Sequence, residues 1–169
     1  LLLAAEVGGD GSFIEKANET RVTSLGKDLD KTGVFREKSM KDTFQVLKEY
    51  KDQLKDLGIG PETVIVTATE AARVAKNSTE FFQKVKEEIG FQVTIINGEG
   101  EAYYTSYGVV SRSQLSENNI TIMDIGGAST ELIRVSVKPF EILSSISLPI
   151  GSVRCTDWRR RRVRHRPAD

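Results

Sequence analysis

The sequence predicts an α/β fold, because short apolar runs rich in β-branched residues alternate with stretches of helical periodicity. Near residue 125 two of the apolar runs flank a pair of glycines, which indicates a hairpin and makes the predicted sheet mixed rather than purely parallel. The 169 residues, 38% of them hydrophobic and 28% charged, suffice for a soluble globular domain with its own core. No linker or internal repeat divides the chain, so we expect one domain.

The first part of the chain is expected to contain strands followed by a long helix. Residues 1–7 are predicted to form a strand, residues 8–11 a turn, residues 13–25 two more strands and residues 26–33 a polar loop. The clearest helix spans about residues 37–57, where apolar residues recur at helical spacing. Its expected start box is Ser39 with Asp42, and its expected stop is Gly58 followed by Pro61.

The rest of the chain alternates strands and helices more closely. The expected order is a buried strand at residues 63–68, a helix around residues 81–89, a strand at 93–96, a helix at 99–110 and three strands between residues 120 and 148. Helices inserted between strands are typical of α/β domains.

The formal net charge of zero hides an uneven distribution. Six arginines and one aspartate follow position 157, so residues 1–157 carry 18 basic and 23 acidic side chains, a net charge of −5. We interpret residues 158–169 as an Arg-rich disordered tail rather than a specific nucleic-acid-binding element. No apolar run approaches the ~20 residues of a membrane span. The single cysteine excludes an internal disulfide and suits a reducing, cytoplasmic location.

The stretch around the glycine pair gathers most of the polar groups that could perform chemistry: Asp124, Gly126, Gly127, Ala128, Ser129, Thr130 and Glu131. Small residues let backbone N–H groups approach a phosphate, hydroxyls add donors, and carboxylates can hold a cation or position water. The chain lacks the Gly-Lys-Ser/Thr of a P-loop here. The alternative is an ordinary hairpin with a turn of small residues.

Two further groups follow predicted strands. Arg73 comes shortly after residue 68, where a guanidinium suits phosphate recognition, although a solvated helix arginine has the same pattern. Glu99 and Glu101 open a predicted helix, where they either stabilise its first turn or orient water. Because open α/β sheets bind ligands at strand ends, the arginine, the carboxylates and the glycine turn together predict phosphoryl chemistry.

Four stretches resemble motifs of a known family. Residues 69–77 resemble T-x-x-x-R-x-A-x-N, residues 96–102 resemble I-S-G-x-E-E-A with Gly108-Val109 following, residues 123–132 resemble I-D-I-G-G-G-S-T-E-L, and residues 147–154 resemble S-L-x-x-G-x-V-R. In this order they are similar to the exopolyphosphatase / guanosine pentaphosphate phosphohydrolase family. The resemblance covers nearly all of residues 1–157 and implies a ribonuclease-H-like fold of the actin, Hsp70 and sugar-kinase superfamily.

The resemblance also implies roles. Glu101 matches the family's catalytic glutamate, which orients water for attack on a terminal phosphoryl group of inorganic polyphosphate or guanosine pentaphosphate. Asp124 and Glu131 match acidic positions of the Mg²⁺ and water environment. The small residues 126–130 match a phosphate-binding loop, and Arg73 matches a phosphate-contacting arginine. The physical logic agrees, since hydrolysis of a phosphoanhydride needs charge neutralisation and one positioned water.

Three departures from the family pattern bear on activity. Gly100 replaces the first of the paired glutamates and is expected to loosen the helix start. Ala128 replaces the third glycine and is tolerated only with a negative φ. The family's opening D-x-G-S/T-N-S loop is absent, so residues 1–157 resemble an N-terminal domain truncated at both ends, with low expected activity.

Three other functions remain open at this point. One is a kinase or ATPase of the same superfamily, and another is a non-catalytic module that binds guanosine tetraphosphate. The least favoured is a basic RNA-binding protein, in which the tail would carry the binding. The residues do not decide which phosphoanhydride is preferred, or whether the parent protein is a homodimer.

Overall fold

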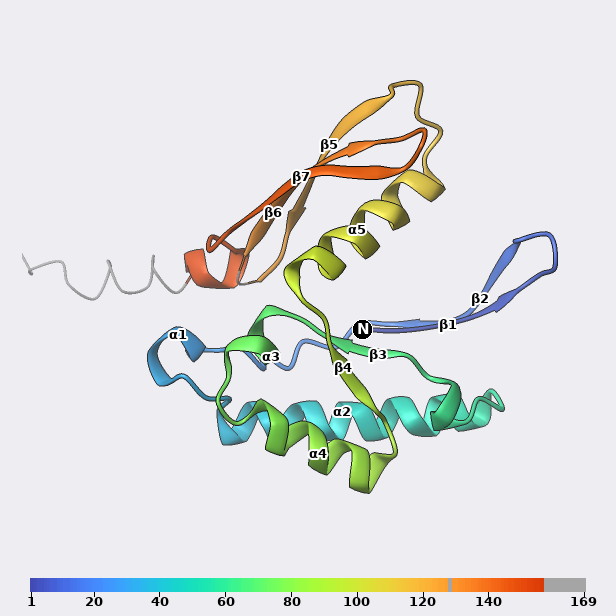
Figure 1. The fold of residues 1–169 in the computed structure, drawn as a ribbon. Coiled ribbons are helices and arrows are strands. Elements are labelled where there is room, and N and C mark those ends of the chain that lie inside the picture. Colours follow the sequence, from blue (N-terminus) through green and yellow to red (C-terminus); the bar gives the residue numbers. More distant parts are fainter. Residues whose placement is uncertain (128, 157–169) are drawn as a thin grey trace, which may run out of the picture. The chain divides into compact units, whose positions relative to one another are not determined.

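The computed structural model describes residues 1–127 and 129–156, which form two compact units (Figure 1). The first unit is Leu1–Ile95 and the second begins at Ile96. The expectation of a single domain stays a prediction. No helix in the described residues is long and apolar enough to cross a lipid bilayer.

A two-stranded antiparallel sheet opens the first unit. Strand β1 (Leu2–Val7) pairs with β2 (Phe13–Glu19), and Gly11 N–H donates to the Gly8 carbonyl in the turn between them. The predicted further strand up to residue 25 is wrong, because the backbone after Glu19 has no strand partner. Val22 in this segment is 87% exposed, although Leu25 at its end packs against the core of the unit.

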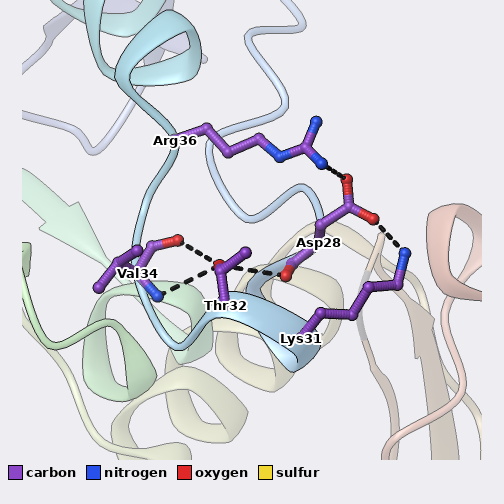
Figure 2. Close-up of polar contacts among 5 residues, drawn as sticks. All are labelled: Asp28, Lys31, Thr32, Val34 and Arg36. Carbon is purple, nitrogen blue, oxygen red and sulfur yellow. Dashed lines mark hydrogen bonds and ion pairs between the residues drawn. The ribbon is translucent and has the colours of Figure 1, made fainter.

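The expected polar loop at residues 26–33 contains a short helix, α1 (Leu29–Thr32). Its first turn is anchored by the buried Leu29, and Asp28 precedes it in the left-handed region at φ 54°. The Asp28 carboxylate lies between the Lys31 ammonium and the Arg36 guanidinium and makes an ion pair with each (Figure 2). The loop prediction was wrong here because this local ion cluster and one apolar anchor together stabilise a helical turn.

The long helix α2 (Glu37–Asp56) confirms the predicted periodicity, with Tyr50 and Leu54 buried on its inner face. Its predicted start box is wrong. Arg36 occupies the N-cap position without a side-chain cap, and Ser39 lies inside the helix, where it is buried. Gly58 ends the helix region as expected, because its φ of 73° is one that glycine adopts without strain.

The second half of the first unit holds a parallel strand pair and short helices. The elements are the 3₁₀ turn η1 (Pro61–Thr63), β3 (Val66–Ala68), α3 (Glu70–Val74), α4 (Ser78–Ile89) and β4 (Val93–Ile95). Strands β3 and β4 pair in parallel, from Val66 opposite Val93 to Ala68 opposite Ile95. The strand expected at residues 63–68 is shorter and less buried than predicted, since Ile65 is 90% exposed.

The core of this unit lies between the strands and the two long helices. Its fully buried side chains include Phe35, Val85, Ile89 and Phe91, and the rings of Phe35 and Phe81 meet edge to face with centroids 6.1 Å apart. Both α2 and α4 therefore turn their apolar faces toward the strands, as their periodicity predicts.

The second unit is one helix beside a three-stranded antiparallel sheet. Helix α5 (Gly98–Arg112) is followed by β5 (Asn119–Ile125), β6 (Thr130–Ser136) and β7 (Glu141–Leu148), in the order β5-β6-β7. Residues 152–156 are helical. Parallel and antiparallel strand pairs both occur with helices between them, which confirms the α/β prediction. Within the described residues they lie in three separate sheets, and none of these mixes the two kinds of pair.

One face of this sheet packs against α5. Ile122, Ile133 and Val135 are buried there together with Ala102 of the helix. Tyr103 and Tyr107 stack with centroids 6.0 Å apart, and both rings meet Phe140 edge to face. The helix is therefore held to the sheet along its length.

Candidate functional site

The glycine turn joins β5 to β6 as a tight hairpin. Ile125 pairs with Thr130 at the last rung, and Gly126 N–H donates to the Ser129 carbonyl at 2.9 Å. A Cβ added to Gly126 would lie 3.3 Å from that carbonyl oxygen, and one on Gly127 would lie 3.4 Å from Val153 Cγ2. The contact at Gly126 is tighter than most side chains make, which favours a glycine there, whereas the contact at Gly127 is an ordinary van der Waals distance. Ala128, predicted to belong to the phosphate loop, lies outside the described residues.

The segment that follows β7 supports this turn. Ser152 N–H donates to the Gly126 carbonyl at 3.0 Å, while Val153 N–H and Arg154 N–H donate to the Gly127 carbonyl at 3.0 and 3.1 Å. The start of the helix at 152–156 thus directs its first N–H groups at the turn, and these are the groups that a helix leaves without internal partners. The carbonyls of Gly126 and Gly127 are thus held by residues more than twenty positions away.

The two hydroxyl residues of the turn, Ser129 and Thr130, are not freely exposed to water. Ser129 is buried, with 7% of its surface exposed. The Thr130 hydroxyl donates to the Ile150 carbonyl, which ties the start of β6 to the supporting segment. In this structure the Thr130 hydroxyl therefore stabilises the turn, and its predicted contact with phosphate stays a prediction.

Asp124, Glu131 and Ser147 form a row across the three strands. Asp124 is directly opposite Glu131, and Glu131 is directly opposite Ser147, so all three side chains leave the same face of the sheet. The Ser147 hydroxyl donates to Glu131 Oε1 at 2.8 Å. The Thr105 hydroxyl on α5 donates to Asp124 Oδ2 at 3.4 Å, so this is the face that the helix covers.

Helix α5 carries Glu101 toward the turn. Glu101 lies one helical turn before Thr105, so the two side chains share a face of α5. Val110, near the C-terminal end of α5, packs against the same buried cluster as Ile120 at the start of β5, whereas Thr105 reaches Asp124 near the turn. The N-terminal end of α5 therefore lies on the side of the glycine turn. Glu101 is closer to that end than Thr105 is.

The start of α5 is well formed despite the glycine that replaces a glutamate. Asn97 is the N-cap, and its side-chain oxygen accepts a hydrogen bond from Gly100 N–H at 2.8 Å. Glu101 N–H then donates to the Asn97 carbonyl at 3.0 Å. The expected loosening at Gly100 is not found, because the asparagine cap satisfies the helix end.

Arg73 lies in the first unit, exposed in the last turn of α3. The motif around it ends at Asn77, whose side chain accepts from Phe35 N–H at 2.8 Å and donates to the Phe35 carbonyl at 3.1 Å. Asn77, the N-cap residue of α4, therefore fastens the start of that helix to the segment before α2. That Arg73 contacts the same phosphate as the glycine turn of the second unit stays a prediction.

The donor set fits a magnesium ion that is shared with a substrate. Mg²⁺ is usually held by one or two carboxylates together with waters and phosphate oxygens, and Asp124 and Glu131 supply two carboxylates from one rung of the sheet. A hydroxyl orients each of them, as outer-shell partners do for metal ligands. Within residues 1–127 and 129–156, no cluster of three or more His, Cys, Asp or Glu side chains could hold a metal ion alone.

Sequence reasoning did not identify several supporting residues. Ser147 opens the fourth family motif, and that position was the available signal for it. Thr105 and Ser152 gave no signal, because their contacts depend on how α5 and the segment after β7 pack. The Arg-rich tail at residues 158–169 lies outside the described residues.

The fold and the glycine hairpin suit a protein that acts on phosphate groups, and comparison with known proteins identifies the family. The model of the Ppx/GppA phosphatase family matches residues 6–164, and the chain belongs to that family. Its fold is accordingly the ribonuclease-H-like α/β fold of the actin, Hsp70 and sugar-kinase superfamily.

The individual relatives are longer than this chain. It is 34% identical over 161 residues to a bifunctional 3-dehydroquinate synthase/phosphatase of Fusobacterium nucleatum, covering 92% of this chain and 24% of that protein. A crystal structure of the Aquifex aeolicus Ppx/GppA family member matches with 36% identity and a TM-score of 0.75, covering 92% and 49% of the two chains. An exopolyphosphatase from Cytophaga hutchinsonii matches with 29% identity and a TM-score of 0.83, covering 92% and 48%. The chain therefore spans about half the length of these solved relatives.

Proposed function

We propose that this polypeptide belongs to an enzyme that hydrolyses the terminal phosphoanhydride bond of inorganic polyphosphate or guanosine pentaphosphate. The observation that carries the proposal is the carboxylate row of Asp124 and Glu131 beside the glycine turn, with Glu101 carried toward that turn by α5. Membership of a phosphatase family supports the same reaction class.

In the proposed reaction Glu101 acts on a water molecule. Its carboxylate accepts a proton from the water, whose oxygen attacks the terminal phosphorus in line with the bridging oxygen. The bond between that phosphorus and the bridging oxygen breaks. Inorganic phosphate leaves with the oxygen of water, and the shortened polyphosphate, or guanosine tetraphosphate, keeps the bridging oxygen.

The remaining residues neutralise and position the phosphate. Backbone N–H groups of the turn at residues 126–130, apart from that of Gly126, which donates to the Ser129 carbonyl, are proposed to contact its oxygens, and Arg73 to add a guanidinium. Asp124 and Glu131 are proposed to hold Mg²⁺, which when bound would neutralise negative charge on the phosphate oxygens. Ser147 and Thr105 orient those two carboxylates.

Polyphosphate is the better candidate substrate, since a solved relative is an exopolyphosphatase. A non-catalytic module that binds guanosine tetraphosphate, or a kinase of the same superfamily, would use the same turn. Neither alternative needs a water-orienting carboxylate, so Glu101 distinguishes them from the hydrolase. The proposal includes a cytoplasmic location, which suits both substrates.

Phosphate release tests the proposal directly. Long-chain polyphosphate and guanosine pentaphosphate are each incubated with the full chain, with Mg²⁺ or with a chelator, and free phosphate is measured with malachite green. Glu131→Gln is expected to lower the rate at least about tenfold, whereas Glu141→Gln, an exposed glutamate at the far end of the same sheet, should leave it unchanged.

The same assay gives the turnover number of the chain, which the sequence predicts to be well below the ~10 per second of an ordinary enzyme. Equal loss in both glutamate variants, or release that does not need Mg²⁺, would contradict the assigned metal site. Tight binding of guanosine tetraphosphate by calorimetry together with no release of phosphate would favour the binding module.

A further inference from the structure

Both glycine carbonyls of the turn between β5 and β6 accept hydrogen bonds from one other segment of the chain. The Gly126 carbonyl accepts from Ser152 N–H at 3.0 Å and from the Ser152 hydroxyl at 3.2 Å. The Gly127 carbonyl accepts from Val153 N–H at 3.0 Å and from Arg154 N–H at 3.1 Å. Two successive peptide groups are therefore held by the same three residues, which we name the clamp.

The clamp determines the direction of the Gly127 N–H. The C=O and N–H of one trans peptide group point in opposite directions, because the group is planar. The Gly126 carbonyl and the Gly127 N–H belong to the same peptide group, so this N–H points away from Ser152. Gly127 is exposed, and within the described residues its N–H donates to no backbone carbonyl. It is therefore a donor that a ligand can reach.

A peptide group between two glycines does not keep one orientation by itself. Glycine adopts positive and negative φ almost equally well, so the group between Gly126 and Gly127 can rotate and present its carbonyl oxygen where its N–H was. An N–H attracts a phosphate oxygen, whereas a carbonyl oxygen repels it. The clamp opposes the rotation, because the rotated group would lose both hydrogen bonds from Ser152.

The orientation matters because the surrounding charge is negative. Asp124 and Glu131 face each other one rung before the turn, and two carboxylates repel an anion that approaches this end of the sheet. The Gly126 N–H cannot help to attract the anion, since it donates to the Ser129 carbonyl at 2.9 Å. Of the two adjacent glycines, only Gly127 therefore offers its N–H on the open side of the turn.

We propose that the clamp is a positioning element, which holds the Gly127 N–H in the orientation that donates to an oxygen of the bound phosphate. Ser152 is its main positioning residue, because it donates twice to the peptide group that carries this N–H. The clamp acts through the turn and does not itself touch the substrate. This inference rests on the proposed function and deepens it, since it names one phosphate donor and the residues that direct it.

The first test uses the full chain, Mg²⁺ and methylenediphosphonate, in which a carbon replaces the bridging oxygen of a phosphoanhydride and prevents hydrolysis. Amide NMR spectra recorded during the titration are expected to show a saturable shift of the Gly127 amide. The Gly126 amide should move much less, because its N–H is already bonded to the Ser129 carbonyl. The two adjacent glycines are thus a matched pair within one molecule.

The second test removes the donors of Ser152. Ser152 is the first of the helical residues 152–156, and proline is tolerated at the first position of a helix. Ser152→Pro loses the N–H and the hydroxyl, so it is expected to bind methylenediphosphonate at least about tenfold more weakly and to lose the selective shift at Gly127. Ser152→Ala keeps the N–H and should show a smaller loss.

The control for proline itself is Glu37→Pro. Glu37 is the first residue of α2 and follows a residue with extended backbone, which proline requires. This variant should bind methylenediphosphonate as tightly as the unchanged chain.

Four results would overturn the inference. They are equal shifts of the Gly126 and Gly127 amides, no saturable shift of the Gly127 amide up to about 1 mM ligand, equal binding by Ser152→Pro and Ser152→Ala, or equal weakening in Glu37→Pro. The first two use the unchanged chain, so they decide the question even if Ser152→Pro does not fold. A selective, saturable Gly127 shift without phosphate release from polyphosphate would support the clamp and contradict the hydrolase.

Discussion

Ile133 is the side chain on which the second unit should depend most. It is fully buried, and it forms a small buried cluster with Ala102, Ile122 and Val135. Ile133→Ala removes three carbons, which costs about 2.4 kcal/mol of transfer free energy at about 0.8 kcal/mol each. The cavity left behind raises the expected loss to about 3–4 kcal/mol, because so small a core has few neighbours that can fill it.

Native-state hydrogen exchange measures this loss within the second unit. Amides of β6 are expected to exchange about 150- to 1000-fold faster in Ile133→Ala, the factor that corresponds to this free energy. The control is Ile146→Ala on the neighbouring strand, where the side chain is 56% exposed and the cost should stay below about 1 kcal/mol. Equal effects of the two variants, or a loss below about 1 kcal/mol in Ile133→Ala, would refute the assignment of the core face.

Two further predictions concern the helix that carries Glu101 and the pH dependence of the first unit. Asn97→Ala removes the side-chain cap of α5 and should lower stability by about 1 kcal/mol, measured by urea denaturation; Asn119→Ala is the exposed control, and an equal effect there would contradict the cap. Burial raises the pKa of Tyr50 above its ordinary value of about 10. Above that pH the unfolded chain loses the Tyr50 proton while the folded chain keeps it, so the folded state should lose stability as the pH rises. Tyr50→Phe should abolish this contribution to the slope of unfolding free energy against pH, and an unchanged slope would contradict the burial of the hydroxyl.

Elements defined by their own periodicity could be predicted from the sequence. The apolar spacing in α2 and α4 is set within each helix, so their extents agree with the structure to within a few residues. Predictions that depend on a partner failed. Residues 20–25 have the alternation of a strand but no neighbour to pair with, and Ser39 has the type but not the position of a cap.

In the candidate site, too, residue types could be predicted from the sequence, whereas contacts between distant segments could not. Asp124, Glu131 and the glycines could be singled out because their residue types carry the chemistry themselves. The facing of Asp124 and Glu131 depends on the register of β5 and β6, and the support from Ser152 and Val153 depends on a chain reversal after β7. Neither the strand register nor the chain reversal can be predicted from the local sequence. Gly100 was judged from the residue it replaces, whereas the helix start depends on Asn97.

The most direct test of the proposed chemistry compares phosphate release from polyphosphate by two variants. One is Glu101→Gln, and the other is Glu99→Gln, two residues earlier in the first turn of α5. Loss of a water-orienting base predicts a fall of about 10²- to 10⁴-fold for Glu101→Gln with little change for the exposed Glu99→Gln. Equal rates in the two variants would show that hydrolysis proceeds without this carboxylate.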